Sequence, residues 1–393
     1  MADSRAMPAP LDVIELTKRL LRFDTINPPG RERDCAHLLG GLLEQGGYAV
    51  RYWEFDDTRT CVVARIGGEA AADGGAQPFA AGRKPLCLTG HIDTVPLGTV
   101  PWTRDPFAGE TDGDRLYGRG STDMKAGVAA IVVVALELAP HLRRSPGLEI
   151  VLTAGEEQGC QGSAFLARQA DALSRAGAIL VAEPTANYPY VGHKGIFKFL
   201  GRTRGVAAHA SRPHLGDNAI YKAADAVQRL RYHDFGCPAH PVMGLPTLNV
   251  GTIRGGQNLN SVPDFAEVGV DIRTVPGVDH ACLCEDLRRA LGPEVEMHMV
   301  NDMPPVWTEP QDAWVQRVFD IVAAHHGERP TPQTITAYTD AGSLRRWYGD
   351  PPTVILGPGE PELAHMVDEH CRISRTEESV AIIRRVVQDW CGV

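Results

Sequence analysis

Short apolar runs alternate with helical patterns through the first half of the chain, and this alternation limits the possible fold more than any other feature. Helical spacing of apolar residues covers 11–23, about 32–46 and about 124–139, and a further helix is expected from about residue 162. The strand-like runs are YAVRYWEF, CVVARI, PLCLTG, LEIVLTA and AILVAE. Strands that alternate with helices predict an α/β fold, in which helices cover both faces of a sheet.

The pattern changes after VGHKG at 191–195. Helices are predicted at about 217–232 and 279–291, between strands IFKFLGRTRG, LNVGTIRGG, FAEVGVDIRTV and VEMHMV. A smaller α+β unit is therefore expected, ending near Val300. The remainder, with a helix at 313–325, a strand TVILG and a last helix at about 376–390, can complete the first domain. The 393 residues exceed one average domain, so we predict a domain of 1–191 and 303–393 that carries 192–302 as an insertion.

Composition narrows the classes of partner. The formal charge is -10, and no local run of Lys and Arg suggests nucleic acid or a membrane surface as a partner, so a small-molecule substrate is favoured. No apolar stretch approaches the roughly 20 residues that span a bilayer, and the first twelve residues have no signal-peptide core. The nine cysteines form no CxxC pair and are expected to be reduced and mostly buried. We therefore expect a cytoplasmic protein, with the Ala/Gly stretch 67–83 as a surface loop.

Acidic and imidazole side chains stand at successive strand ends and helix starts, where open α/β sheets form their ligand crevices. Adjacent glutamates at a buried strand end repel each other, and desolvation also raises their pKa values, so a positive charge is expected beside them. An imidazole two residues before an aspartate can bind a metal while the carboxylate fixes its ring. The set is His91, Asp93, Asp123, Glu156, Glu157, Glu183 and His365.

Each member of this set also has a simpler interpretation. Asp123 could cap the helix that follows it. Glu157 and Glu183 could be solvated strand ends, and the two histidines could be ordinary loop residues. The combination is more specific than any member, because four successive segments each deliver one such group.

Seven stretches carry a resemblance to a known family. They are GHIDTVP, GRGSTDMKAG, GEEQG, EPT, HASRPHLGDNA, NSVP and AHMVDE, in that order. With them the chain, from RFDTINPPG to its last helix, resembles the co-catalytic zinc deacylases and carboxypeptidases. That family includes acetylornithine deacetylase, succinyl-diaminopimelate desuccinylase, carboxypeptidase G and aminoacylase. The resemblance implies a zinc-peptidase-like catalytic domain with a mixed sheet, an inserted lid and dimerisation domain, and a homodimer.

The resemblance also implies a ligand set for two Zn²⁺ ions. His91, Asp123 and Glu183 would hold one ion, and Glu157, Asp123 and His365 the other, so that Asp123 bridges them and is followed by a cis peptide bond. Three carboxylates and a bridging hydroxide balance the charge of two Zn²⁺ ions, and ligands without thiolates suit a hydrolytic site. Co²⁺ or Mn²⁺ are possible substitutes.

Metal-assisted amide hydrolysis follows from this resemblance. Glu156 would take a proton from the water between the two zincs as the resulting hydroxide attacks the acyl carbonyl, and would pass that proton to the leaving amine. His209 of the inserted domain would stabilise the oxyanion. Asn260 and Arg273 would bind the substrate carboxylate, for which the planar fork of arginine is suited. Arg273 could instead form an ion pair on the strand surface.

The substrate is less well defined than the chemistry. Thr339 matches a family Thr-Asp loop near the substrate, but Tyr338 precedes it where glycine is common. Arg212 also stands where the desuccinylase has tyrosine. The leading hypothesis is a deacylase of N-acyl amino acids, closest to acetylornithine deacetylase. The alternatives are a dipeptidase or carboxypeptidase with the same site, or a non-catalytic protein with a structural metal site. Glu156 argues against the last of these because it has no ligand role.

Overall fold

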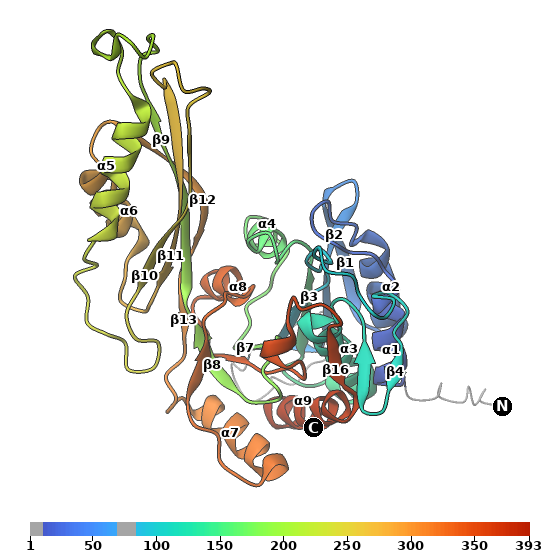
Figure 1. Ribbon diagram of the computed structural model, residues 1–393. Helices are drawn as coiled ribbons and strands as arrows, with labels where there is room; N and C mark the ends of the chain where they lie inside the picture. The colour runs from blue at the N-terminus through green and yellow to red at the C-terminus, as the bar shows by residue number, and fades with distance from the viewer. Residues whose placement is uncertain (1–10, 69–83) are drawn as a thin grey trace, which may run out of the picture. The chain divides into compact units, whose positions relative to one another are not determined.

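The computed structural model describes residues 11–68 and 84–393, and these form two compact units (Figure 1). The first consists of the described part of Met1–Gly192 together with Thr308–Gln333 and Thr339–Val393; the second is His193–Trp307 with Thr334–Tyr338. The second unit therefore extends to Trp307, beyond the end of the insertion expected at 192–302, and it also includes the segment Thr334–Tyr338. Most of the expected surface loop, from residue 69 to 83, lies outside the described residues.

The first unit is built on a mixed sheet, which confirms the predicted fold class. Its strands are ordered β1 (Ala49–Asp56), β2 (Arg59–Ile66), β6 (Leu148–Thr153), β3 (Leu86–His91), β7 (Ala178–Val181), β15 (Thr353–Ile355) and β8 (Tyr190–His193). The central strands β6, β3, β7 and β15 are parallel, while β1, β2 and β8 run antiparallel to their neighbours. The short strands β13 (Val306–Trp307) and β14 (Gln333–Ile335) join at β8, where the chain passes between the units.

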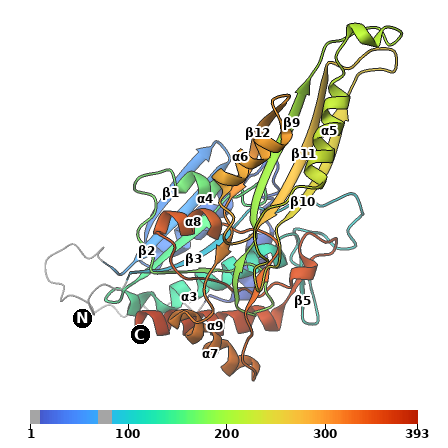
Figure 2. The ribbon, with the colours of Figure 1, turned by 90° about the vertical axis from the view of Figure 1, so that its left-hand side faces the viewer.

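Helices cover both faces of this sheet, as Figure 2 shows with α4 and α8 across the sheet from α3 and α9. The helices of this unit are α1 (Val13–Leu21), α2 (Arg33–Gln45), α3 (Ala126–Leu142), α4 (Gln161–Leu166), α7 (Ala313–His326), α8 (Ala341–Tyr348) and α9 (Ile373–Cys391). Apolar periodicity and Asp or Gly at the ends explain α1 and α7, whose first turns are capped by Asp12 and Asp312. Helix α8 was not predicted from the sequence.

The segment Ser121–Leu142 corrects one expectation from the sequence. It is 22 residues long with a mean hydropathy of 1.6, so by length and composition it could cross a membrane, although no such stretch was expected. The structure instead packs α3 against β3, β6, α1 and α9, and 78% of its most apolar window is buried inside the protein. A helix that is apolar on all sides is what the centre of a large core requires.

A small antiparallel sheet lies in the same unit, ordered β16 (His370–Arg372), β5 (Arg115–Tyr117) and β4 (Thr111–Asp112). It pairs His370 with Tyr117 and so joins two segments that are far apart in the chain. Two short helical turns, η2 (Ser121–Lys125) and η4 (Pro361–Leu363), also lie in the first unit. A third, η3 (Pro213–Leu215), lies in the second unit.

The second unit is an antiparallel sheet ordered β10 (Thr247–Gly255), β11 (Phe265–Thr274), β9 (Gly195–Arg204) and β12 (Val295–Met303). Helices α5 (Ala219–Arg231) and α6 (His280–Leu291) pack on one face of it over a core that includes Phe197, Val268 and Leu287. Along β11 the alternate residues Ala266 to Ile272 are buried in that core. Asp271 and Arg273 therefore lie on the opposite face, because side chains alternate along a strand.

Candidate metal centre

The parallel strands of the first unit end at one edge of the sheet, and the candidate ligands lie there. His91 is the last residue of β3, Glu157 follows β6, and Glu183 follows β7. Asp123 lies in η2, before α3, and His365 lies in the segment after β15. The order of strands, rather than the order of residues, brings these side chains to one place, as expected for the carboxyl ends of parallel strands.

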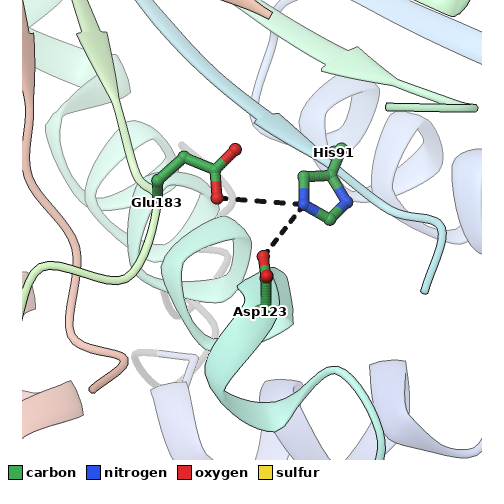
Figure 3. A group of neighbouring side chains, drawn as sticks. All are labelled: His91, Asp123 and Glu183. Carbon is green, nitrogen blue, oxygen red and sulfur yellow. Dashed lines mark hydrogen bonds and ion pairs between the residues drawn. The ribbon is translucent and has the colours of Figure 1, made fainter. Parts of the chain in front are cut away.

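His91, Asp123 and Glu183 form the first group of ligand atoms (Figure 3). The Nε2 atom of His91 is 3.1 Å from Oδ1 of Asp123 and 3.9 Å from Oε2 of Glu183. Ligands bound to one tetrahedral Zn²⁺ at about 2.1 Å lie roughly 3.4 Å apart. The spacing of the three atoms therefore fits a single divalent metal ion.

Asp123, Glu157 and His365 form the second group. The Nε2 atom of His365 is 3.3 Å from Oδ2 of Asp123 and 3.2 Å from Oε1 of Glu157. Asp123 thus offers one carboxylate oxygen to each group, as a residue shared by two ions must. The peptide bond from Asp123 to Met124 is cis, which confirms the expectation from the sequence. His365 has a φ of 65°, in the left-handed region that non-glycine residues adopt uncommonly.

The electrostatics of the two ligand groups favour a bound cation. Burial, reinforced by the neighbouring negative charges, raises the pKa of Glu183 well above its usual range. Hydrogen bonds with Asp123 and Glu157 raise the pKa of His365 to about 10. For Asp123, burial opposes ionisation, but hydrogen bonds with His365 and His91 outweigh it and lower the pKa. Imidazole and carboxylate donors without thiolates are the ligands of hydrolytic zinc sites, so the residues fit the metal that the resemblance implies.

Glu156 differs from its neighbour Glu157 in belonging to neither group. Its side chain is 5% exposed, and its Oε1 atom accepts a hydrogen bond of 3.5 Å from the thiol of Cys160. Burial raises the pKa of Glu156 well above its usual range; His91 lowers it, and the carboxylates of Glu183 and Glu157 raise it further. A carboxyl group whose pKa is raised in this direction holds a proton more readily than an exposed glutamate does, as a group that accepts and returns a proton requires.

Asp93 is fully buried and contacts both the ring of His91 and the main chain of the two adjacent glutamates. The Nδ1 atom of His91 is 3.0 Å from the main-chain oxygen of Asp93 and 3.4 Å from its carboxylate, so the main chain makes the shorter contact with the ring. The carboxylate accepts hydrogen bonds from the main-chain N–H groups of Glu156, at 3.0 Å, and Glu157, at 3.2 Å. Burial opposes ionisation of Asp93, but hydrogen bonds from His91 and Asn27 outweigh it and lower the pKa.

The sequence analysis did not single out Asn27. Its Nδ2 atom donates a 2.9 Å hydrogen bond to Oδ2 of Asp93, and the residue is 1% exposed. The stretch NPPG indicated only the end of a helix. A buried amide beside a candidate site residue is visible in the tertiary structure alone.

The remaining predicted site residues have separate surroundings. In the second unit His209 is exposed and hydrogen-bonded to Ser211. The N–H of Ala210 donates a hydrogen bond of 2.9 Å to the carbonyl of Asn260, so the segments of His209 and Asn260 are adjacent. Arg273 forms a two-point ion pair with Asp271, at 2.8 and 3.2 Å, which is the alternative that the sequence left open. In the first unit Thr339 is buried, and its Oγ1 atom accepts from the N–H of Ala341 at the start of α8.

Comparisons with known proteins agree with this geometry. Residues 87–389 match the family described as peptidase family M20/M25/M40. The chain is 31% identical over 330 residues to acetylornithine deacetylase of Edwardsiella ictaluri. The alignment covers 80% of this chain and 82% of that relative. The chain is 28% identical to a probable succinyl-diaminopimelate desuccinylase of Staphylococcus epidermidis, over 92% of this chain and 93% of that one.

A solved structure shares the fold along nearly the whole chain. The M20 family metallo-carboxypeptidase Sso-CP2 of Sulfolobus solfataricus matches with a TM-score of 0.76 at 18% identity, over 97% of this chain and 99% of that chain. The resemblance drawn from the seven sequence stretches is thus confirmed by family, relatives and fold. The chain belongs to peptidase family M20/M25/M40 and is a metal-dependent amidohydrolase.

Proposed function

We propose that this enzyme removes the acyl group from an N-acyl amino acid, as a deacylase of the acetylornithine deacetylase type with two Zn²⁺ ions. The observation that carries the proposal is Glu156, a buried carboxyl group that lies beside two complete ligand groups and belongs to neither. A purely structural metal site has no use for such a residue, whereas amide hydrolysis needs a group that moves a proton.

The residues of the first unit divide the work of this reaction. Bound metal ions would supply the Lewis acidity that lowers the pKa of a water molecule and polarises the amide carbonyl. Glu156 then takes the proton of the attacking water and returns it to the leaving amine. Asp93 keeps Glu156 and Glu157 in place through their main-chain N–H groups, so that proton transfer and ligation stay on separate side chains.

Substrate recognition is assigned to residues of both units. His209 would stabilise the oxyanion, and Asn260 and Arg273 would bind the carboxylate of the amino acid, with Thr339 near the substrate. The adjacent segments of His209 and Asn260 support a shared role for these two. For Arg273 the role requires its guanidinium to exchange or share its ion pair with Asp271.

A panel of substrates tests the proposal. Wild-type enzyme would be assayed with N-acetyl and N-succinyl amino acids, including N-acetylornithine and N-succinyl-diaminopimelate, and with dipeptides, in added zinc and in chelator. We expect hydrolysis of an N-acyl amino acid that is lost in chelator and restored by zinc. Hydrolysis of dipeptides alone would instead assign the enzyme to the peptidases. Failure on the whole panel by protein that carries its metal would reject both.

We further infer that the enzyme forms a homodimer through its second unit and that it works in the cytoplasm. Within the described residues β10 pairs only with β11, so it is an edge strand. Tyr221 in the nearby helix α5 and Tyr232, which follows that helix, are exposed. Exposed strand edges and aromatic side chains are typical of surfaces that pair with a second copy. None of the nine cysteines, all of which lie in the described residues, forms a disulfide, and most are buried, which supports a reducing compartment. Light scattering of the purified protein measures the oligomeric state directly.

A further inference from the structure

Glu369 is a buried carboxylate whose partners all come from the segment that carries Asp123. Its side chain is 1% exposed. Oε1 accepts hydrogen bonds from the main-chain N–H groups of Thr122, at 2.9 Å, and Asp123, at 3.0 Å. Oε2 accepts from the N–H of Gly120, at 3.1 Å, and from Nη1 of Arg119, at 2.6 Å. One carboxylate therefore satisfies three main-chain donors and one guanidinium in a segment of five residues.

Arg119 connects this carboxylate to two further segments of the candidate site. It is also 1% exposed, and its guanidinium lies over the ring of Trp102, 5.0 Å from the centroid. Nη2 donates a hydrogen bond of 3.1 Å to the carbonyl of Pro96, in the segment that follows His91 and Asp93. Nη1 donates 3.3 Å to the carbonyl of Met366, the residue after His365. Three ligand-bearing segments thus meet at one buried ion pair.

The segment of Glu369 is itself joined to the segment of Asp123 on both sides. The N–H of Gly118 donates 2.9 Å to the carbonyl of Glu369, and the hydroxyl of Thr122 donates 2.7 Å to the carbonyl of His370. His365 precedes Glu369 by four residues and contacts Asp123 directly. These bonds relate the two segments without using any ligand atom of the metal groups.

We propose that Glu369, paired with Arg119, is a positioning residue for the metal centre, which holds Asp123 and His365 at ligating distance. The proposal rests on the metal-dependent function inferred above. Asp123 is shared by both ligand groups, so a small displacement of its main chain affects both ions at once. Partners that orient metal ligands typically change metal affinity or activity by about 10- to 100-fold when they are removed. The ion pair is buried, so loss of one partner also leaves an uncompensated charge on the other.

A purely structural role is the alternative, and Glu149 provides a matched control for it. This residue is also a fully buried carboxylate in an ion pair, with Arg65, and it accepts hydrogen bonds from the N–H of Ser174 and the hydroxyl of Tyr348. It lies near the start of β6, whereas Glu156 and Glu157 follow the end of that strand. Replacing Glu149 therefore disturbs a comparable buried network away from the ligands.

The experiment compares Glu369→Gln, Glu369→Ala and Glu149→Gln. Metal-free full-length proteins would be titrated with Zn²⁺ against a chelating dye, and their unfolding temperatures measured in parallel. In Glu369→Gln the amide oxygen can keep the bonds to Thr122 and Asp123, while the NH₂ group faces other donors. We expect zinc affinity to fall in both Glu369 variants, by about 10- to 100-fold in Glu369→Ala and less in Glu369→Gln. Glu149→Gln should lower the unfolding temperature but leave zinc affinity within about twofold.

Co²⁺ gives a second readout that stability alone does not change. Its visible absorption reports the geometry of its ligands, so the spectra of the Glu369 variants should differ from those of wild type and Glu149→Gln. Wild-type zinc affinity and wild-type Co²⁺ spectra in both Glu369 variants would overturn the proposal and leave Glu369 a structural residue. If Glu369→Ala does not fold, Glu369→Gln decides by the same criteria. Protein that binds Zn²⁺ but hydrolyses nothing in the substrate panel contradicts the proposed function, and the affinity comparison still decides the role of Glu369.

Discussion

At the scale of single residues, the adjacent glutamates Glu156 and Glu157 show how one strand end supports two roles. Their side chains diverge, so Glu157 reaches His365 at 3.2 Å while Glu156 contacts Cys160 instead. Asp93 accepts hydrogen bonds from the main-chain N–H groups of both and so holds the main chain from which the two side chains diverge. Substitutions at the two positions should therefore have different consequences.

Glu156→Ala should lower kcat by about 100-fold or more while metal content stays at the wild-type level, because the proposed mechanism gives this residue proton transfer and no ligand role. Glu157→Ala is the matched control and should lose bound metal together with activity. Elemental analysis beside turnover measurements separates the two cases. Near-normal turnover in Glu156→Ala would remove it from the proposed mechanism.

Glu32 should make stability depend on pH in a defined direction. Burial and the charge of Asp93 raise its pKa from 4.5 to about 7, although Arg59 opposes the shift. The folded state then binds this proton more tightly than the unfolded state, so the contribution to stability is full below pH 4.5 and is lost as the pH rises to about 7. The loss is at most roughly 3 kcal/mol.

Urea unfolding of the metal-free protein across that pH range, in wild type and Glu32→Gln, measures this contribution. The difference in unfolding free energy between the two proteins should change between pH 4.5 and 7 and level off above. A difference that stays constant with pH would show that Glu32 titrates normally.

At the scale of elements, α3 packs closely against the main chain next to the candidate ligand Glu183. Gly127, in the first turn of α3, has no room for a side chain: an added Cβ would lie 2.1 Å from the carbonyl oxygen of Ala182, the residue before Glu183. In α2, by contrast, a Cβ at Gly41 would meet nothing within 4 Å. The two glycines differ in their surroundings but both lie inside helices.

Gly127→Ala should therefore destabilise the protein by about 1–3 kcal/mol and weaken metal binding, because the main chain before Glu183 has to move. Gly41→Ala should stabilise it by about 0.5–1 kcal/mol, since alanine loses less conformational entropy in a helix. Denaturant unfolding and zinc titration of both variants provide the test. Equal stability and equal zinc affinity in the two variants would contradict the packing argument.

At the scale of the whole molecule, the candidate residues are divided between two units with separate cores. The five candidate metal ligands belong to the first unit, and His209, Asn260 and Arg273 belong to the second. In the proposed dimer we expect His209 of one subunit to serve the metal site of the other, as the family resemblance implies.

Mixing inactive His209→Ala with inactive Glu156→Ala tests this arrangement. If His209 acts across the dimer, each mixed dimer has one site with both residues intact, and its activity approaches about half that of wild type. If His209 acts within its own chain, every site keeps one defect and no activity returns. The double variant mixed with itself is the negative control, and subunit exchange is verified independently with two tags.

The sequence by itself determined the elements that depend on local pattern. Periodicity located all the long helices and the central strands to within a few residues, because apolar spacing and end residues act over one or two turns. It did not locate α8, nor the small sheet of β4, β5 and β16, whose strands of two or three residues are too short for a pattern to emerge. The candidate ligands followed from strand ends and from the family resemblance.

Only the tertiary structure decided which of these residues meet. His365 contacts Glu157 across 208 positions in the chain, and Glu369 binds the N–H of Asp123 across 246. Asn27 reaches Asp93, 66 positions along the chain, through a contact that no periodicity encodes. Such contacts depend on strand order, register and the packing of buried groups, which are properties of the whole chain, whereas a sequence pattern reports only the few residues around each position.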